Sequence, residues 1–341
     1  MERKIAEEVL DIKTRIVRSA SYNPWFNLAL EEHLLKSVGR DEVILYLWQN
    51  QGTVVIGRNQ NAWRQCRCRE LEADGKKLAR RLSGGGAVFH DLGNLNFTFL
   101  IEGKHYNLER QLEVILQAVR EQGIKAEFTG RNDLTVAGKK FSGNAFYFDE
   151  RNAYHHGTLL IDVNFADMMR YLQVSEEKIR SKAIESVKAR VVNLKNLNPE
   201  ITIASMTDSV ASAFITIYGG SKNIEEIAPE EIGLEDLYRR YSSWEWRYGE
   251  SPKFDLQFDT RFPWGEIQVG LSLRKGQIVK AKIYSDAMNP QLIEEMAGAL
   301  HNVPLQPASI SACLASLAVQ DPERPVLTQF QDWLTEKISR L

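Results

Sequence analysis

The sequence contains few cysteines and carries little net charge. Cys66, Cys68 and Cys313 are the three cysteines in 341 residues. Such an odd, sparse set fits a reducing compartment better than a disulfide framework. The single residue between Cys66 and Cys68 is also too short a spacer for C-x-x-C chemistry. The formal net charge is -2 and the sequence pI is about 6.4, so no broad basic surface for nucleic acid is expected.

Long apolar runs are also lacking. No stretch of the sequence is long enough to span a bilayer as a helix. Positions 1–15 mix acidic with basic side chains and lack an uninterrupted apolar segment, which argues against a secretory signal or transit peptide. We therefore expect a cytoplasmic protein with no membrane and no nucleic-acid partner.

The remaining composition is that of a globular protein, with 43% hydrophobic and 26% charged residues. A chain of 341 residues favours two domains over one core. Aromatic, glycine and proline residues gather at 244–252, and we predict a junction there. The expected domains are a catalytic domain over 1–247 and a small α+β domain over 253–341.

Hydrophobic spacing predicts the main elements of the first domain. Helices are expected over 24–36 and 108–119. Leu95, Phe97, Phe99 and Ile101 alternate with small or polar residues, which predicts one half-buried strand. Other strands are expected at 43–48, 53–56, 77–82 and 157–163, with a hairpin over 134–147. From there to residue 247 the pattern is mostly helical.

The most informative segment is Arg-Arg-Leu-Ser-Gly-Gly-Gly-Ala-Val-Phe-His-Asp, at 80–91. Three successive glycines allow backbone N–H groups to converge into an anion-binding nest. Because consecutive strand residues face opposite sides, we favour Arg81, which shares parity with Ser83, over Arg80 as a phosphate ligand. The alternative is a tight glycine-rich turn with two solvated arginines. The segment matches neither a P-loop nor a dinucleotide fingerprint, which disfavours the usual kinases and nicotinamide dehydrogenases.

A second segment, at 130–145, places lysines on a strand close to a glycine. A lysine in that position suits a point charge held against a phosphate or carboxylate. Asn132 and Asp133 offer oxygen ligands of the kind that Mg²⁺ prefers. The alternative is that this segment is an ordinary turn, with a solvated lysine and a loop capped by the aspartate. Taken alone, these residues favour that alternative. His155 and His156 should face opposite sides of their strand, so we expect no shared metal and assign neither a catalytic role.

Together these segments resemble the lipoate–protein ligase A family. The shared motifs are Asn-Pro-Trp-Phe-Asn-Leu-Ala with Glu31 and Glu32, Leu-Trp-Gln-Asn at 47–50, Val-Val-Ile-Gly-Arg at 54–58, and the segments at 80–94, 130–134, 140–145, 155–160 and 186–194. The resemblance continues through 244–246 and 262–265 and covers nearly the whole chain. It implies an α+β fold: a large domain of the biotin/lipoate ligase type, related to class II aminoacyl-tRNA synthetases, and a small mobile C-terminal domain.

The resemblance also implies site residues. Lys140, rather than Lys139, takes the place of the family's essential lysine. The nucleotide-binding residues are then Arg81, Ser83, Gly84, Gly85, Gly86, Ala87, Val88, Phe89, Asn132, Asp133, Lys140, Lys188 and Arg190. The lipoyl pocket would comprise Trp48, Arg81, Gly85, Gly86, His90, Lys140, Gly143 and His156. The chain departs from the family in a shorter hairpin before Lys140 and in Asn144, where a second serine can occur; we expect the shortening to alter a surface turn only.

These residues predict a ligase that uses ATP and Mg²⁺ to activate lipoate. Attack of a carboxylate on the α-phosphate brings two anions together, so cations and N–H donors must stabilise the growing charge. Lys140 would bridge the carboxylate and α-phosphate, Arg81 and the glycines would hold phosphates, and Asp133 would bind Mg²⁺. The expected acceptors are apo lipoyl domains of 2-oxoacid dehydrogenase complexes and the glycine-cleavage H protein, and the expected state is a monomer.

The main alternative is an octanoyl- or lipoyltransferase on the same fold, which takes a preactivated acyl group. No cysteine lies between Cys68 and Cys313, which argues against the cysteine nucleophile of octanoyltransferases. A biotin ligase is disfavoured because its Gly-Arg-Gly-Arg loop is missing. A non-catalytic lipoate-binding module is a further alternative, but Lys140 and the complete 80–91 segment argue against it.

Overall fold

A computed structural model describes residues 12–129, 133–173, 190–248, 254–274 and 276–340. The chain forms two compact units. The first comprises Met1–Thr53, His90–Met169 and Val174–Tyr241, and the second comprises Val54–Phe89, Arg170–Gln173 and Ser242–Leu341. Val54–Phe89 therefore groups with the C-terminal part of the chain, although it lies inside the catalytic domain predicted over 1–247. The bounds 1–247 and 253–341 remain a prediction about sequence domains.

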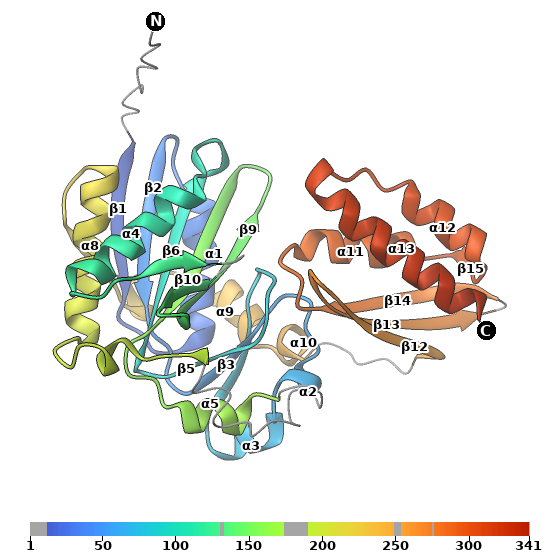
Figure 1. The fold of residues 1–341 in the computed structure, drawn as a ribbon, viewed down its shortest axis with the longest axis horizontal. Coiled ribbons are helices and arrows are strands. Elements are labelled where there is room, and N and C mark those ends of the chain that lie inside the picture. Colours follow the sequence, from blue (N-terminus) through green and yellow to red (C-terminus); the bar gives the residue numbers. More distant parts are fainter. Residues whose placement is uncertain (1–11, 130–132, 174–189, 249–253, 275, 341) are drawn as a thin grey trace, which may run out of the picture. The chain divides into compact units, whose positions relative to one another are not determined.

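The first unit is built on an eight-stranded sheet with the strand order β11-β1-β2-β6-β10-β9-β8-β7. Figure 1 labels five of its strands, β1, β2, β6, β10 and β9. Its strands are β1 (Lys13–Ser19), β2 (Glu42–Trp48), β6 (Asn94–Glu102), β7 (Glu127–Thr129), β8 (Asp133–Val136), β9 (Lys139–Phe148), β10 (Asn152–Leu160) and β11 (Ile224–Ile227). β1 pairs in parallel with β2 and β11, whereas the remaining pairs are antiparallel.

Helices cover both faces of this sheet. They are α1 (Pro24–Ser37), α4 (Leu108–Glu121), α8 (Ile203–Tyr218) and α9 (Glu235–Ser242), and α5 (Phe165–Tyr171) follows β10. Odd-numbered strand residues such as Leu45 and Phe97 pack with Ile115 of α4 and Phe214 of α8 in the main core. α1 contacts β2, β6 and β10, and its first turn is capped by the Asn23 side chain, which accepts from the Trp25 N–H.

The strand predicted from Leu95 to Ile101 is buried on both faces, so the prediction of a half-buried strand was wrong. Eight of the nine residues of β6 are buried. The alternation of large and small side chains reflects packing against α4 and α8 on one side and α1 on the other. α1 shields the polar face of β6 from water, so the polar side chains on that face must form hydrogen bonds within the protein.

The second unit contains two sheets. β4 (Lys77–Arg80), β3 (Thr53–Ile56) and β5 (Val88–His90) form one, accompanied by α2 (Ala62–Gln65), α3 (Cys68–Ala73) and α10 (Trp244–Arg247). The other is antiparallel in the order β12 (Leu256–Phe262), β13 (Gly265–Arg274), β14 (Gln277–Ser285) and β15 (Val303–Pro304). Its apolar side chains form a separate core with α11 (Pro290–Ala299), α12 (Pro307–Ala315) and α13 (Arg324–Ser339).

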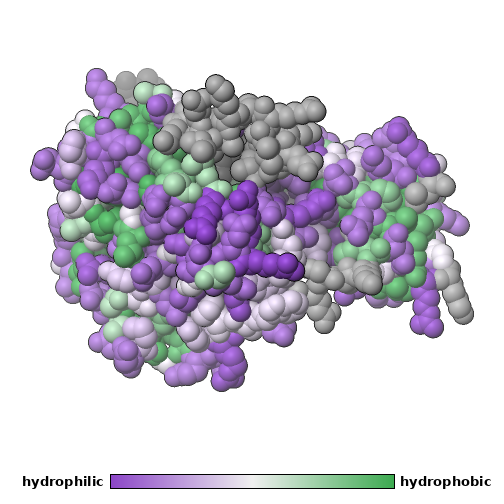
Figure 2. Space-filling model, turned by 90° about the horizontal axis from the view of Figure 1, so that it is seen from below, coloured by the Kyte–Doolittle hydropathy of each residue, from purple (hydrophilic) through white to green (hydrophobic). Residues whose placement is uncertain are grey.

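The helices predicted at 24–36 and 108–119 and the hairpin at 134–147 are confirmed. Helices predominate among the elements described between residues 163 and 247, as predicted. The prediction missed the short strand β11, which enters the sheet by pairing with the N-terminal strand β1. No helix among the described residues is both long and apolar enough to cross a membrane. Hydrophilic residues cover much of the face seen in Figure 2, with apolar residues in separate groups between them.

Candidate active site

The glycine-rich segment forms a loop between β4 and β5 that is organised around the Arg81 side chain. Arg81 Nε donates to Ser83 Oγ at 3.0 Å, and Nη2 donates to the carbonyl oxygens of Gly84 and Gly86 at 2.7 and 2.8 Å. Arg80 faces away from this loop, and its guanidinium contacts other carbonyl oxygens, among them that of Gln60 at 2.7 Å. The carbonyls of Gly84 and Gly86, on either side of Gly85, therefore both point toward Arg81.

This arrangement sets the direction of the loop N–H groups. Within a trans peptide, C=O and N–H point opposite ways. Because the Gly84 carbonyl points at Arg81, the N–H of Gly85 must point away from it, and it donates to the Ala287 carbonyl at 3.1 Å. Gly85 has φ +87°, a backbone conformation that glycine adopts without strain. The same geometry directs the Ala87 N–H away from Arg81, because the Gly86 carbonyl also faces that guanidinium.

Gly84 is required for the contact between this loop and the segment after β14. A Cβ at Gly84 would lie 2.2 Å from the Ala287 carbonyl oxygen and 2.8 Å from that of Met288. Real side chains do not approach so closely, and any substitution would push the two backbones apart. In this conformation one N–H of the predicted anion nest is therefore occupied by the protein's own backbone.

Lys140 lies near the start of β9, next to the predicted oxygen ligand. Its Nζ is 2.7 Å from Asp133 Oδ1, and about a third of each side chain remains exposed. The ammonium also lies across Gly143, because a Cβ there would be 2.8 Å from Nζ. The Gly143 N–H in turn donates to Thr158 Oγ1 of β10 at 3.2 Å. The absence of a side chain at Gly143 thus makes room for a lysine amine on the strand surface.

In the basic segment at 186–193, residues 190–193 are described, and they contact strand β9 at Lys140. Val191 forms an isolated parallel bridge with Lys140, and the Val192 N–H donates to the Lys140 carbonyl at 2.9 Å. Arg190 is exposed just before this bridge. Two other predicted nucleotide ligands, Asn132 and Lys188, lie outside the described residues.

A buried chain of hydrogen bonds links four elements on the α1 side of the sheet. Trp48 Nε1 donates to Thr98 Oγ1 at 3.0 Å, and Thr98 donates to Glu31 Oε1 at 2.7 Å. His156 Nδ1 lies 2.8 Å from the same carboxylate oxygen. Each of these four residues is at least nine-tenths buried. A buried carboxylate with two such contacts holds both the hydroxyl of β6 and the imidazole of β10 in fixed orientations.

His90 completes this group, and His155 stands apart from it. The His90 ring lies edge-on to Trp48 with 6.0 Å between centroids, and its Nδ1 lies 3.2 Å from Asn50 Nδ2. An amide nitrogen can only donate, so Nδ1 is the acceptor in this contact. His155 instead contacts Asn144 and α4 on the opposite face, and burial lowers its pKa to about 3.

The structure brings the predicted residues together in three groups. Trp48 and His156 share the buried chain through Thr98 and Glu31, and His90 lies against the Trp48 ring. Lys140, Asp133 and Gly143 form a second group, and both groups belong to the first unit. Arg81, Ser83, Gly84, Gly85 and Gly86 form the third, in the second unit, and Ala87, Val88 and Phe89 continue it into β5. Thr98 and Glu31 were missed as site residues, although a glutamate among apolar helix positions signals a buried, paired carboxylate.

Comparisons with known proteins match both parts of the chain. Residues 23–215 match the Lipoyl protein ligase A/B catalytic domain, and residues 251–334 match the Bacterial lipoate protein ligase C-terminus. The chain is similar to Lipoate-protein ligase A of Blochmanniella floridana, with 37% identity over 96% of this chain and 100% of that protein.

Two solved structures are also similar to this chain. LipL1 of P. falciparum, crystallised in complex with lipoate, has a TM-score of 0.84 and 29% identity, covering 95% of this chain and 99% of that chain. A bi-partite lipoate protein ligase from Thermoplasma acidophilum, described with its E2 lipoyl domain, has a TM-score of 0.64 and 25% identity, covering 72% of this chain and 100% of that chain. These structures confirm the predicted α+β fold.

Proposed function

Because the chain belongs to the lipoyl protein ligase A/B family, we propose that it is an ATP-dependent lipoate–protein ligase. In this proposal lipoate attacks the α-phosphate of ATP, forming lipoyl-AMP and releasing pyrophosphate. The amine of an acceptor lysine then attacks the acyl carbon and displaces AMP. Apo lipoyl domains are the proposed acceptors, and the archaeal ligase described with its E2 lipoyl domain supports that choice.

The observation that carries the proposal is the Lys140 ammonium, held 2.7 Å from Asp133 across the bare backbone of Gly143. The first chemical step forces a carboxylate toward a phosphate, and a positive charge fixed in advance lowers the barrier because it need not be reoriented during the reaction. A substrate carboxylate would take over the partner role that Asp133 has here. The exposed third of the lysine side chain allows that exchange.

The phosphates are assigned to the glycine-rich loop. Arg81 fixes the loop carbonyls, so the N–H groups of Gly85 and Ala87 point outward as potential phosphate donors. Gly85 would have to release the Ala287 carbonyl before it could bind a phosphate.

Mg²⁺ would neutralise charge on the departing pyrophosphate. Asp133 fits as one oxygen ligand, because Mg²⁺ usually keeps several waters and takes few ligands from the protein. Lys140 holds one of its carboxylate oxygens here, so metal binding and release of this ion pair would be coupled.

The lipoyl chain is assigned to the α1 side of the sheet, near Trp48, His90 and His156. The Trp48 indole donates to Thr98 at 3.0 Å, and the His156 imidazole lies 2.8 Å from Glu31. Rings fixed in this way present a rigid, largely apolar wall to an aliphatic ligand, which suits a pocket that must bind a carbon chain.

The octanoyltransferase alternative requires a reactive and accessible thiol, and the cysteines do not favour one. Cys66 and Cys68 are buried. The side-chain hydrogen bond with Cys68 and burial raise the pKa of the Cys66 thiol. The hydrogen bond with Cys66 lowers the pKa of Cys68, but burial keeps that thiol from a substrate. Burial also raises the pKa of Cys313. A catalytic thiol needs a depressed pKa and access to substrate.

The test is pyrophosphate release from ATP and free lipoate, followed by intact-mass analysis of an apo lipoyl domain. A lipoyltransferase would modify the domain only when given preformed lipoyl-AMP. In the ligase, Lys140→Ala should lower kcat/KM for adenylate formation by about a hundredfold to a thousandfold, as does removal of one transition-state donor elsewhere. Lys139→Ala is the matched control, since Lys139 is exposed on the same strand. Adenylation by Lys140→Ala at the rate of Lys139→Ala would refute the assignment.

A further inference from the structure

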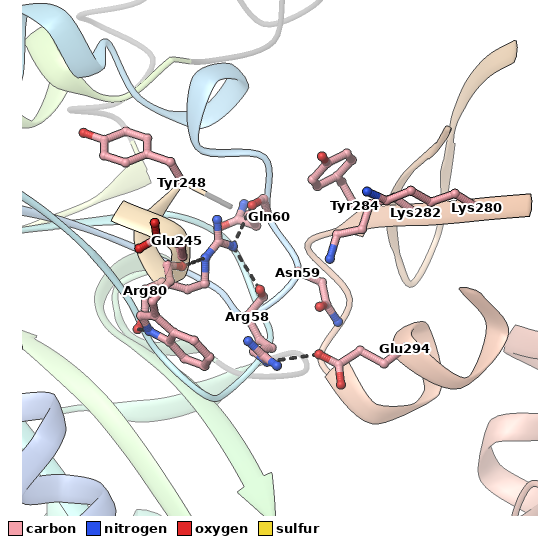
Figure 3. Close-up of a pocket in the computed structure, with 11 residues that line it drawn as sticks. Arg58, Asn59, Gln60, Arg80, Glu245, Tyr248, Lys280, Lys282, Tyr284 and Glu294 are labelled. Atoms are coloured by element: carbon pink, nitrogen blue, oxygen red, sulfur yellow. Dashed lines mark hydrogen bonds and ion pairs between the residues drawn. The ribbon is translucent and has the colours of Figure 1, made fainter. Parts of the chain in front are cut away.

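Arg80 holds the backbone of the 57–60 loop, which follows β3. Its Nη1 donates to the carbonyl oxygens of Gly57 at 3.2 Å, Arg58 at 2.9 Å and Gln60 at 2.7 Å. Figure 3 shows the guanidinium pointing toward Arg58 and Gln60. Carbonyl dipoles that converge on one point repel one another unless a donor lies between them. The shape of this loop therefore depends on the guanidinium.

The other nitrogens of Arg80 anchor the side chain to α10. Nε donates to the Trp246 carbonyl at 2.8 Å and Nη2 to the Arg247 carbonyl at 2.9 Å, and the Trp246 indole donates to the Arg80 carbonyl at 2.9 Å. Burial and the neighbouring Arg58 lower the pKa of Arg80 to about 10, so the guanidinium stays protonated at neutral pH and keeps all of its N–H donors. An arginine fixed in this way is a rigid support for the 57–60 loop.

The 57–60 loop is packed against the glycine-rich loop. The Arg58 N–H donates to the Ser83 carbonyl at 2.9 Å. A Cβ at Gly57 would lie 2.4 Å from the Gly85 carbonyl oxygen, which is closer than real side chains approach, so the contact requires glycine at this position. The Gly85 carbonyl therefore points at the bare backbone of Gly57. A shift of the 57–60 loop would be transmitted to Gly85, because the two backbones lie in contact.

This contact sets the direction of one further N–H group. Within a trans peptide the C=O and N–H groups point opposite ways, and the described residues contain no cis peptide. Because the Gly85 carbonyl faces Gly57, the N–H of Gly86 points away from Gly57. Arg81 sets the N–H directions of Gly85 and Ala87 in the same way. The two consecutive arginines thus fix successive N–H groups of one loop from different sides.

We propose that Arg80 is a positioning residue for phosphate binding, which acts through the 57–60 loop to fix the Gly86 N–H. The inference rests on the proposed function, in which the glycine-rich loop holds the phosphates of ATP. Arg80 does not bind phosphate itself, because backbone carbonyls occupy its donors. A donor that is fixed before the ligand arrives need not be reoriented. Without the guanidinium, the peptide between Gly85 and Gly86 is free to rotate, and a phosphate loses one N–H donor.

Steady-state kinetics of lipoyl-AMP formation by the full chain test this role. Arg80→Ala should raise KM for ATP by about tenfold to a hundredfold, the effect of losing one charge-assisted hydrogen bond. KM for lipoate should keep the wild-type value, because the side chains assigned to the lipoyl chain belong to the other unit. Arg64→Ala is the matched control, since Arg64 is exposed on α2, and it should leave both constants unchanged. Equal KM for ATP in the two variants, or equal rises for ATP and lipoate, would overturn the proposal.

Two other variants keep the test decisive if Arg80→Ala does not fold. Arg80→Lys retains the charge but has fewer donors for the loop carbonyls, so its KM for ATP should also rise. A wild-type KM in Arg80→Lys would show that charge alone suffices and would refute the positioning role. Gly57→Ala leaves Arg80 intact and pushes the Gly85 carbonyl away from the other side. It should raise KM for ATP as well, and a folded Gly57→Ala protein with the wild-type KM would contradict the proposal.

Hydrogen exchange separates this inference from the proposed function, because it needs no substrate. The Arg58 amide, which donates to Ser83, should exchange faster in Arg80→Lys than in Arg64→Ala. Equal exchange, with normal lipoyl-AMP formation by the wild type, would overturn the role of Arg80 alone. A wild type that forms no lipoyl-AMP would overturn the proposed function, and the role of Arg80 in ATP binding would fall with it.

Discussion

The buried hydroxyl of Thr98 should stabilise the first unit out of proportion to its size. It accepts from Trp48 Nε1 at 3.0 Å and donates to Glu31 Oε1 at 2.7 Å, and its residue is fully buried. Thr98→Val keeps the shape of the side chain but removes both hydrogen bonds. Trp48 and Glu31 would then each lose a partner at a place that water does not reach.

The expected cost follows from the kind of bond removed. A hydrogen bond to a charged group contributes about 1.5–3 kcal/mol and a neutral one about 1 kcal/mol. The free energy of unfolding of the first unit should therefore fall by about 2–4 kcal/mol in Thr98→Val. Native-state hydrogen exchange of amides in β2, β6 and β10 is the appropriate assay, because it reports the stability of this sheet separately from that of the second unit.

Thr98→Ser is the control, since it keeps the hydroxyl and loses only a methyl group. The serine variant should keep most of the stability that the valine variant loses. The reasoning would be refuted if the free energy of unfolding obtained from exchange in Thr98→Val lay within about 0.5 kcal/mol of the wild-type value. Ordinary surface substitutions cause changes of that size. It would mean that Glu31 and Trp48 find other partners.

Two further predictions concern the glycine-rich loop and pH. Gly84→Ala should break the hydrogen bond from Gly85 to Ala287 and lower the free energy of unfolding by about 1–3 kcal/mol, as overpacking does. The Gly85 amide should then exchange its hydrogen faster. Gly86→Ala is the control and should leave that exchange rate unchanged, because a Cβ at Gly86 meets nothing within 4 Å. Equal exchange in the two variants would contradict this. Burial lowers the pKa of His155 from 6.5 to about 3. The folded protein therefore keeps His155 neutral at pH values where the unfolded chain protonates it. The resulting stability is fully present above pH 6.5 and falls by about 1.4 kcal/mol for each pH unit between 6.5 and 3. Urea unfolding from pH 7.5 to 4.5 should show this slope in the wild type and not in His155→Gln, and parallel profiles would contradict it.

The different directions of Arg80 and Arg81 could be predicted from sequence because strand parity is a local property. Side chains one residue apart on a strand face opposite ways, and Ser83 marked the side of the loop. The structure places Arg81 against Ser83 and the glycine carbonyls, and Arg80 against other backbone carbonyls. The roles proposed for these residues in binding phosphate remain predictions.

The partnership of Glu31 with Thr98 could not be predicted in the same way. Phe97 and Phe99 reveal one apolar face of β6, but nothing in the local pattern says that α1 buries the other. The bond joins positions 67 residues apart, and only the assembled sheet brings them together. The contact of Gly85 with Ala287 is likewise invisible to local spacing, because a glycine run predicts a turn without predicting what approaches it.

The parallel pairing of β1 with β11 has a consequence for biosynthesis. Ile16 of β1 pairs with Ile224 of β11, and ribosomes elongate chains by roughly 5–20 residues per second. The N-terminal strand therefore emerges some tens of seconds before its outer neighbour exists, with one edge open to pairing with other chains. We expect this interval, rather than the finished protein, to be the stage at which nascent chains depend most on chaperones.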